Sequence, residues 1–344
     1  MAPGTNRQVV LASRPTGPVD EATFETRAAP VPEPGDGEIL VRTAYVSLDP
    51  TMRGWISDRP SYMPPVGIGE VMRAGGNGEV VVSNHPAFRA GDLVQGMTGW
   101  QEYAVGGSSG VGGFRKLPAW MSLRHSLSVY GITGMTAYFG LIDIGRPSAG
   151  ETVVVSGAAG ATGSVAGQIA KILGCRVIGI AGTAEKCAWV KDDLGFDECI
   201  NYRQEDVARR LRETCPSGID VYFDNVGGET LDTVLLQIGM RARVALCGGI
   251  SSGYNEDSVP YGVRNLMMLI GLRARMEGFL VIDYMDRFDE AAGVMRPWLA
   301  EGKLKSREHV VEGLENCPRA LRMLFEGANT GKLMVQIGPD AAGR

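Results

Sequence analysis

A glycine-rich turn that follows an apolar run is the stretch of this sequence best suited to hold a ligand. Residues 153–163 read VVVSGAAGATG, so that Ala158, Gly160 and Gly163 form an Ala-x-Gly-x-x-Gly pattern. Where such a turn joins a strand to a helix, its backbone N–H groups face a dinucleotide pyrophosphate. Gly160 lets the backbone approach the phosphates, and Gly163 with Gly167 lets the helix pack closely on the sheet. A tight strand–helix turn without a ligand is the alternative, which this context disfavours.

The end of the next strand indicates which dinucleotide the turn would take. A protein that binds NAD usually places an acidic residue there, about 20 residues on, to hold the ribose 2′-hydroxyl. Here Gly182 and Thr183 end the strand, and Glu185 falls on the following helix. Lys186 can offer positive charge to a 2′-phosphate, although a plain surface lysine is the alternative. The sequence therefore predicts NADP(H) as the cofactor.

Alternating strands and helices from residue 131 onward would position this turn. The predicted strands span residues 152–156, 176–181, 198–200, 221–224 and 243–247, and the predicted helices span residues 164–173 and 184–194. Strands that alternate with helices in this way form a parallel, doubly wound sheet.

Residues 1–130 read instead as short strands separated by proline and glycine clusters. These strands are predicted at residues 8–11, 38–45, 79–83, 92–95 and 102–105. Their spacing predicts a partly open β-barrel. Near the other end of the chain, a helix at 318–325 and a strand at 332–337 are predicted. The fold class is therefore α/β, with a β-rich part and a doubly wound parallel sheet.

Composition narrows the class of protein further. The 344 residues include 34 Lys and Arg against 39 Asp and Glu, and the net charge of −5 disfavours a general nucleic-acid binder. Six cysteines lie in the second half without any CxxC pair, which predicts reduced thiols and a cytoplasmic location. The N-terminus lacks the apolar core of a signal peptide. Glycines interrupt the uncharged stretch 153–170, so no membrane segment is expected.

A set of short motifs, spread along the sequence, carries a resemblance to a known family. They are LDPTMRG at 48–54, VGIGEVM at 66–72, GWQEY at 99–103, GMTAYFGL at 134–141, AAGATG at 158–163, DNVGG at 224–228 and GANTGK at 327–332. Through them the chain resembles the zinc-free, NADP-dependent alkenal/one-double-bond reductases of the medium-chain dehydrogenase/reductase superfamily. This is the leukotriene B4 dehydrogenase/prostaglandin reductase group, and the bacterial curcumin-reductase-like members are the most similar branch.

The resemblance implies a domain organisation. A GroES-like catalytic β domain would span residues 1–130, a Rossmann NADP-binding domain residues 131–304, and residues 305–344 would return to the catalytic domain. The cleft between the domains would hold cofactor and substrate. Members of the family usually form homodimers through their Rossmann domains, so a homodimer is expected.

The resemblance also implies cofactor contacts, position by position. These are Gly160, Ala161, Thr162 and Gly163 at the pyrophosphate, Lys186 and Tyr202 at the 2′-phosphate, Asn225 at a ribose, Cys247, Gly248, Ile250 and Ser251 in the loop under the nicotinamide half, Phe279, Leu280 and Val281 at the carboxamide, and Asn329 from the C-terminal tail. Tyr202 is alternatively an edge aromatic, Asn225 a turn residue held by its own backbone, and Cys247 a small buried thiol.

No metal is predicted, and this shapes the expected reaction. Residues 1–174 contain no cysteine, and the three histidines of the chain stand alone, so the ligands of a zinc site are missing. The expected reaction is therefore reduction of the C=C bond of α,β-unsaturated ketones and aldehydes, with hydride transfer to the β-carbon. Tyr254 matches the family tyrosine that would donate a hydrogen bond to the developing enolate oxygen, and a residue that only forms the cleft wall is the alternative.

Three departures from the family pattern fall near the expected substrate pocket. Gly253 adds a residue before Tyr254, Thr51 stands in place of a tyrosine, and Ile132-Thr133 replaces Met-Pro. The physiological substrate therefore stays open. Two other functions also stay open, an NADPH quinone oxidoreductase and a non-catalytic NADPH-binding protein.

Overall fold

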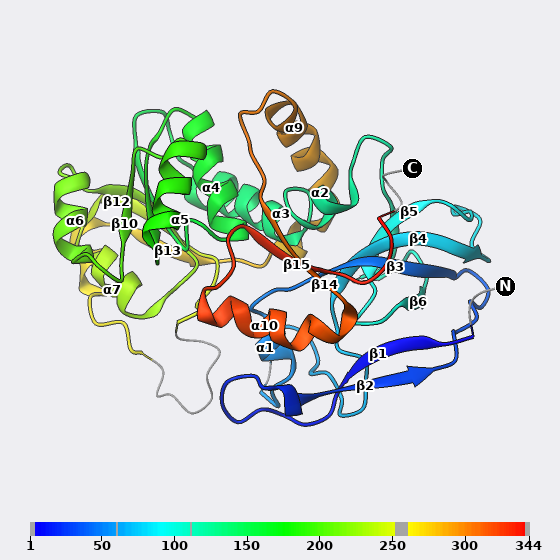
Figure 1. The fold of residues 1–344 in the computed structure, drawn as a ribbon. Helices are drawn as coiled ribbons and strands as arrows, with labels where there is room; N and C mark the ends of the chain where they lie inside the picture. Colours follow the sequence, from blue (N-terminus) through cyan, green and yellow to red (C-terminus); the bar gives the residue numbers. More distant parts are fainter. Residues whose placement is uncertain (1–3, 60, 111, 252–260, 341–344) are drawn as a thin grey trace.

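In the computed structural model, residues 4–59, 61–110, 112–251 and 261–340 are described, and their strands form three β-sheets. A parallel sheet with its helices lies at the left of Figure 1, and the strands of the N-terminal part lie at the right. We call these two parts the parallel lobe and the N-terminal lobe. One apolar cluster joins Tyr45 and Met334 of the N-terminal lobe to Val155 and Val165 of the parallel lobe. The two lobes therefore share a packed core.

The parallel lobe contains a sheet of six strands in the order β10-β9-β8-β11-β12-β13. Their bounds are β8 (Thr152–Ser156), β9 (Arg176–Ala181), β10 (Glu198–Asn201), β11 (Ile219–Asp224), β12 (Ile238–Leu246) and β13 (Arg275–Gly278). The chain runs outward from β8 to β10 and then returns to pair β11 with the opposite side of β8. This order confirms the doubly wound sheet, and it reverses at β8, directly before the glycine turn.

The start of β12 was predicted wrongly. The strand begins at Ile238 rather than at residue 243. Its pairing with β11 shifts register between Ile219 and Val221, and Arg241 takes a positive φ of 60°. Such a bulge disturbs the alternation of inward and outward side chains, so the first residues of the strand carry no readable pattern.

Helical segments connect the strands of the parallel lobe. They are α3 (Ile132–Phe139), η2 (Gly140–Gly145), α4 (Ala161–Ile172), α5 (Ala184–Ala188), η3 (Trp189–Asp193), α6 (Val207–Thr214), α7 (Gly228–Leu235), α8 (Met267–Leu272), η4 (Val281–Arg287) and α9 (Phe288–Ala300). Helix α4 starts three residues before the predicted position. It packs tightly, because a Cβ on Gly167 would lie 1.9 Å from the ring of Phe196. The predicted helix 184–194 is α5 continued by η3.

The N-terminal lobe holds a seven-stranded sheet in the order β14-β15-β3-β4-β5-β7, with β6 also paired to β3. The bounds are β3 (Ile39–Ser47), β4 (Gly75–Ser83), β5 (Leu93–Met97), β6 (Tyr103–Gly106), β7 (Arg115–Lys116), β14 (Glu308–Glu312) and β15 (Lys332–Gln336). The expected barrel is thus a sheet that branches at β3. A hairpin of β1 (Asn6–Leu11) and β2 (Phe24–Ala29) forms the third sheet.

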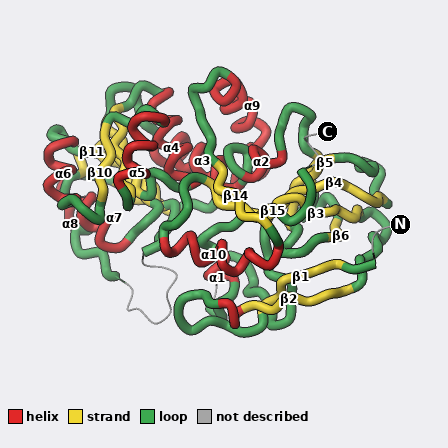
Figure 2. The backbone as a smooth tube through the Cα atoms, viewed as in Figure 1, coloured by secondary structure: helices red, strands yellow, loops and turns green. Residues whose placement is uncertain are grey.

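Short helices complete the N-terminal lobe, and its sheet includes strands from the C-terminal end of the chain. The helices are η1 (Glu21–Thr23), α1 (Met52–Trp55), α2 (Leu123–Leu127), η5 (Leu314–Asn316) and α10 (Cys317–Glu326). Strand β15 pairs antiparallel with β3, and α10 lies beside it (Figures 1 and 2). This sheet membership supports the proposed domain bounds of 1–130, 131–304 and 305–344. None of the helices in the described ranges has the length and apolar character that a membrane crossing requires.

Candidate cofactor and substrate site

The predicted cofactor residues follow the carboxyl ends of the six parallel strands. The cross-strand pairs Ser156–Ile180, Asp224–Leu246 and Leu246–Gly278 align these ends at one edge. Residues 160–163 follow β8, Lys186 follows β9, Tyr202 follows β10, Asn225 follows β11, residues 247–251 follow β12 and residues 279–281 follow β13. Ligands of open parallel sheets bind outside this edge, beside the strand at which the order reverses.

The glycine turn has the geometry of an anion-binding helix start. Gly160 caps α4, and Ser164 is the first residue whose N–H bonds back, to the Gly160 carbonyl at 3.0 Å. The N–H groups of Ala161, Thr162 and Gly163 therefore lack a partner in the preceding turn of the helix and are available to phosphate oxygens.

Ala158 replaces the first glycine of the usual pattern without disturbing the turn. Its side chain is fully buried, and a Cβ on Gly179 of the neighbouring strand would lie 2.9 Å from the Ala158 Cβ. The positive φ of the turn, 59°, falls on Gly157. The glycine that this sequence needs for the turn is therefore one position earlier, and Gly179 makes room for the alanine.

A group that we call the cationic corner consists of Lys186, Tyr202 and Arg203. The Lys186 Nζ donates to the Gly327 carbonyl at 2.8 Å, and an Arg203 Nη donates to the Glu326 carbonyl at 3.5 Å. The Arg203 guanidinium lies 5.8 Å from the centre of the Tyr202 ring. Among the described residues, neither cation forms an ion pair with a carboxylate within the usual distance. Sequence analysis missed Arg203, whose only local signal is its position directly after Tyr202.

Electrostatics in the cationic corner favour an added anion. Burial, with the nearby Arg203 charge, lowers the pKa of Lys186, while Glu185 opposes this shift. Thr183 fixes the lysine in place, because its hydroxyl accepts the Lys186 N–H at 3.2 Å and caps α5. Two cations close to each other and without a carboxylate partner are stabilised by a phosphate.

The missing acid at the end of β9 has a steric explanation. A Cβ on Gly182 would lie 3.0 Å from the Tyr202 ring and hydroxyl. A longer acidic side chain at this position would have to displace the tyrosine. The residues present thus fit a cofactor with a 2′-phosphate, and they do not offer the carboxylate that holds a free 2′-hydroxyl.

The C-terminal tail between α10 and β15 lies against the glycine turn (Figure 1). The Gly331 N–H donates to the Ala159 carbonyl at 2.8 Å, and Gly160 and Gly331 form a parallel bridge. The Asn329 amide donates to the Gly331 carbonyl at 3.1 Å. The structure therefore brings Asn329 to the turn, where its nitrogen is used to hold the tail.

Buried Asp224 organises the loop predicted to lie under the nicotinamide half. Its carboxylate accepts the Ser156 hydroxyl at 2.9 Å and the Tyr222 hydroxyl at 2.7 Å. Its backbone carbonyl accepts the N–H groups of Cys247 and Gly248 at 2.9 and 3.0 Å. Burial, with the Asp224 charge, raises the pKa of the Cys247 thiol to about 12. This favours Cys247 as a small packed thiol rather than a nucleophile.

Asn225 joins the ends of β8 and β11. Its amide donates to the Ser156 carbonyl at 2.7 Å, and its N–H donates to the Ser156 hydroxyl at 2.9 Å. Ile250 and Ser251 then dock on this turn through the carbonyls of Asn225 and Val226, at 3.4 and 3.1 Å. The Asn225 amide nitrogen is therefore engaged in the turn, and its carbonyl oxygen is the atom suited to accept from a ribose hydroxyl.

The segment after β13 is anchored by Phe279. A Cβ on Gly140 would lie 2.3 Å from this ring, so the glycine is what lets Phe279 pack on the start of η2. Leu280 is 39% exposed and Val281 is buried. The ring thus fixes the position of the backbone at residues 279–281, which the family uses at the carboxamide.

We use the name loop 47–53 for the segment of the N-terminal lobe that runs from the last residue of β3 into the start of α1. It carries Thr51, where the family has a tyrosine. The Thr51 hydroxyl lies 2.5 Å from the Tyr62 hydroxyl, so a phenol is present beside this position although residue 51 lacks one. Sequence analysis missed Tyr62, because it lies in a proline-rich stretch with no periodicity. Tyr254, the predicted catalytic residue, lies outside the described residues.

A buried ion pair links this loop to the C-terminal tail. The Lys332 ammonium donates to an Asp49 carboxylate oxygen at 2.6 Å and to the Leu48 carbonyl at 3.1 Å. Ser47 donates to the other Asp49 oxygen. Because Lys332 directly follows Gly331, the tail touches the glycine turn and loop 47–53 with adjacent residues.

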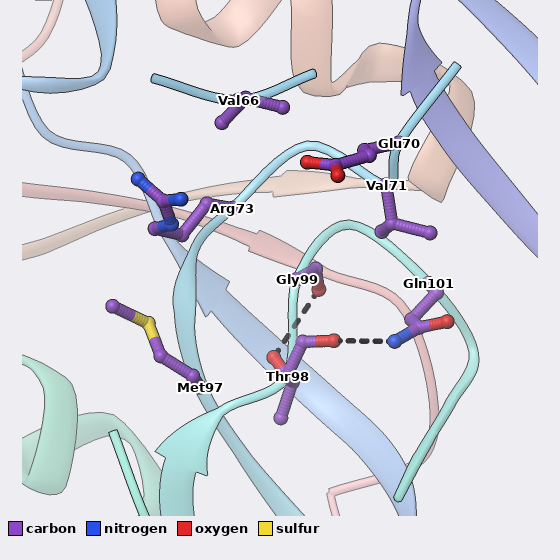
Figure 3. Close-up of a pocket in the computed structure, with 8 residues that line it drawn as sticks. All are labelled: Val66, Glu70, Val71, Arg73, Met97, Thr98, Gly99 and Gln101. Carbon is purple, nitrogen blue, oxygen red and sulfur yellow. Dashed lines mark hydrogen bonds between the residues drawn. The ribbon is translucent and has the colours of Figure 1, made fainter. Parts of the chain in front are cut away.

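Figure 3 shows a pocket of about 250 Å³ in the N-terminal lobe. It is lined by Val66, Glu70, Val71, Arg73, Met97, Thr98, Gly99 and Gln101. The Val66 N–H donates to the Trp55 carbonyl at 2.7 Å, and the Arg73 guanidinium lies 5.6 Å from the Trp55 ring centre. The pocket therefore adjoins α1, and none of the predicted cofactor residues lines it.

Comparisons with known proteins match two family models to this chain. A family model described as an N-terminal domain of oxidoreductase matches residues 7–112, and one described as a zinc-binding dehydrogenase matches residues 161–296. Within the described ranges, no group of three or more His, Cys, Asp or Glu side chains is arranged to hold a metal ion. Independence from metal nevertheless remains a prediction.

Individual relatives match over nearly the full chain. The NADPH-dependent curcumin reductase of Escherichia coli (strain K12) is 44% identical over 97% of this chain and 98% of the relative. The NADP(+)-dependent 2-alkenal reductase of Nicotiana tabacum is 41% identical over 98% of each chain. The crystal structure of CurA from Vibrio vulnificus in complex with NADPH is 47% identical and superposes with a TM-score of 0.91, covering 97% of this chain and 99% of that chain. The predicted family is therefore confirmed, and the chain belongs to the alkenal/one-double-bond reductases of the medium-chain dehydrogenase/reductase superfamily.

Proposed function

We propose that this protein reduces the C=C bond of α,β-unsaturated ketones and aldehydes, with NADPH as the reductant. The observation that carries the proposal is the tail contact. Gly331 touches the cofactor turn at Ala159, and Lys332 holds Asp49 in the loop that carries Thr51. This arrangement puts a dinucleotide site and a loop with hydroxyl donors on either side of one strand end. Relatives named for reduction of an alkenal and of curcumin support the assignment.

The cofactor is NADP(H), as predicted, and relatives that use it confirm this part. The N–H groups of residues 161–163 would hold the pyrophosphate, and the cationic corner would hold the 2′-phosphate. Asn225 would accept from a ribose hydroxyl, and the backbone at residues 279–281 would hold the carboxamide. When bound, NADPH supplies the hydride for the β-carbon of the substrate.

The task left to the chain is to orient the substrate and stabilise the charge that grows on its carbonyl oxygen. A hydrogen-bond donor aimed at that oxygen lowers the barrier. We assign this role to Tyr254, with the Thr51–Tyr62 hydroxyl pair as further candidate donors. The buried Lys332–Asp49 pair positions loop 47–53 for this purpose, because it ties the loop to β15.

A substrate screen separates this proposal from its rivals. Initial rates with NADPH are measured for simple enals, enones and quinones at matched concentrations. We expect enals and enones to be turned over and their products to be saturated carbonyl compounds. Turnover of quinones alone would make the protein a quinone oxidoreductase. Tight NADPH binding without turnover of any acceptor would identify a non-catalytic NADPH-binding protein.

We also propose that the protein is a homodimer. Strand β13 is the outer strand of the parallel sheet, and α8, which packs against the neighbouring strand β12, has no buried residue. Met267 and Ile270 of this helix are 72% and 70% exposed, and Leu236 and Met240 are exposed as well. Figure 2 shows α8 at the outer side of the parallel lobe, beside α6 and α7. An apolar face next to an open sheet edge is suited to pair with a second copy.

Light scattering after size-exclusion chromatography tests the dimer. We expect the mass of two chains for the wild-type protein and of one chain for Ile270→Asp, because an aspartate would be buried without a partner in the interface. Val294→Asp, which changes an apolar residue of α9 that is 36% exposed, serves as the control and should leave the mass unchanged. A single-chain mass for the wild type would contradict the proposal.

We propose a cytoplasmic location, because the six cysteines are all free thiols in the structure. An oxidising compartment would favour disulfides instead.

A further inference from the structure

Two buried cysteines are in contact next to the cationic corner. Cys187 belongs to α5 and Cys199 to β10, and their sulfur atoms are 2.8 Å apart. The two residues are only 9% and 6% exposed. Among the cysteines of the described ranges, this is the pair with sulfurs in contact, since Cys175 bonds to a carbonyl and Cys215 lies against a threonine hydroxyl.

The two sulfurs differ in reactivity. The Cys199 thiol donates to the Cys187 sulfur, and this hydrogen bond lowers the pKa of Cys187 and raises that of Cys199. Burial raises the pKa of Cys199 further. Because the thiolate is the form that attacks an oxidant, Cys187 is the sulfur that reacts first. A second thiol already in contact is what converts such a product to a disulfide.

The chemistry of cross-linking needs one small oxidant, a peroxide. The Cys187 sulfur attacks a peroxide oxygen, the O–O bond breaks, and Cys187 becomes a sulfenic acid while one water leaves with the thiol proton. The Cys199 sulfur then attacks the Cys187 sulfur, the S–S bond forms, and the sulfenic oxygen leaves as a second water with the Cys199 proton. Two thiols are oxidised and one peroxide is reduced to two waters.

Forming this bond requires the two sulfur atoms to approach each other, through rotation of the side chains or movement of α5 against β10. A disulfide is about 2.04 Å long, so sulfurs now 2.8 Å apart must close by about 0.8 Å. Lys186 precedes Cys187 directly, and Tyr202 follows Cys199 by three residues. Tyr202 is fixed to the end of β9 by its N–H bond to the Ala181 carbonyl at 3.1 Å. A movement of α5 on closure would change the spacing between Lys186 and the rest of the cationic corner.

We propose that Cys187 and Cys199 form a peroxide-induced intramolecular disulfide, and that this cross-link weakens the hold of the cationic corner on a 2′-phosphate. The second half of the proposal rests on the cofactor site proposed above. The first half stands on the contact between the two sulfurs alone.

The test uses the full chain, treated with hydrogen peroxide and then freed of it. Peptide mass spectrometry without reduction should find residue 187 linked to residue 199, and the count of free thiols in denatured protein should fall from six to four. Fluorescence titration should show an NADPH Kd weakened about three- to tenfold, with the NADH Kd changed less than about twofold. Dithiothreitol should restore both the thiols and the NADPH Kd.

Single variants complete the test. Cys187→Ser and Cys199→Ala should each have the same NADPH Kd after peroxide as before it. Cys215→Ser changes a buried cysteine outside the pair, and its NADPH Kd should still weaken after peroxide. Failure of the peptides to cross-link in the wild type overturns the proposal, and so does a cross-link that leaves the ratio of the two Kd values unchanged. The wild type answers both questions even where a variant does not fold. If the reduced protein does not bind NADPH at all, the proposed function fails, while the peptide result still decides whether the disulfide forms.

Discussion

Lys186 is the residue whose replacement should most change the choice between NADPH and NADH. We consider Lys186→Met, which keeps the length of the stem and removes the charge. In the structure the ammonium gives one hydrogen bond, to the Gly327 carbonyl at 2.8 Å. An ammonium has three donors, so two remain for phosphate oxygens. The variant would therefore remove the proposed charge-assisted contacts to the 2′-phosphate, together with the bond to Gly327, and leave the glycine turn in place.

The expected size of this loss follows from the surroundings of Lys186. A hydrogen bond to a charged group contributes about 1.5–3 kcal/mol. Lys186 is half-buried, so solvent screens part of its charge, and exposed Arg203 still faces the same anion after the substitution. We therefore expect the lower part of the range, about 1.5–2 kcal/mol, which is roughly a ten- to thirtyfold weaker NADPH Kd.

Fluorescence titration of both reduced cofactors measures this effect without turnover. The wild type should prefer NADPH by at least about tenfold, and Lys186→Met should lose most of that preference while its NADH Kd stays within about twofold. Lys191→Met is the matched control, because this lysine lies on η3, which continues α5, and forms an ion pair with Glu198 of β10 at 3.1 Å. Equal affinity of the wild type for both cofactors, or an unchanged preference in Lys186→Met, would refute the reasoning.

Three further predictions concern pH, metal and the enolate donor. The pKa of Lys186 is lowered by burial, and only its protonated form holds a phosphate, so NADPH affinity should be full below that pKa and weaken as pH rises through it. The loss of NADPH affinity should begin at a pH below the ordinary lysine pKa of about 10.4. The affinity for NADH, and the NADPH affinity of Lys186→Met, should not show this loss. Prolonged chelation should leave activity intact, and elemental analysis should find less than one zinc per chain. A loss of activity that added zinc restores would disprove the prediction of metal independence. Tyr254→Phe should slow single-turnover reduction of a simple enone by up to about 10², since removal of one oxyanion donor costs 10²–10³. An unchanged rate would reduce Tyr254 to packing and leave Thr51 and Tyr62 as the candidate donors.

The parts of the site that could be predicted are those whose sequence signal lies within one short, continuous segment. The glycine turn, the strand before it and the missing acid after β9 all lie within residues 152–186, and each has a local physical cause. The turn needs glycine where the backbone is tight, and a buried strand needs an apolar run. Reading these signals was enough to predict the doubly wound sheet and the cofactor.

The parts that were missed depend on contacts between distant segments. Arg203 has no motif of its own, and its role appears only when the Glu326 carbonyl and Lys186 are seen beside it. Tyr62 became a candidate because its hydroxyl meets Thr51 across a turn-rich stretch. Alternation and helical periodicity report which face of an element is buried, and they carry no information on which loop a side chain will reach.

The C-terminal tail is the clearest case of this limit, because it contacts both the glycine turn and loop 47–53. Lys332 and Asp49 are 283 positions apart in the sequence, yet they form a buried pair at 2.6 Å. A lysine left without its carboxylate at this depth would be strongly destabilising, so the pair fixes β15 against loop 47–53. One residue earlier, Gly331 is fixed to the Ala159 carbonyl. A shift of the tail at either contact must therefore move the other, which makes the position of loop 47–53 depend on the same backbone that borders the glycine turn.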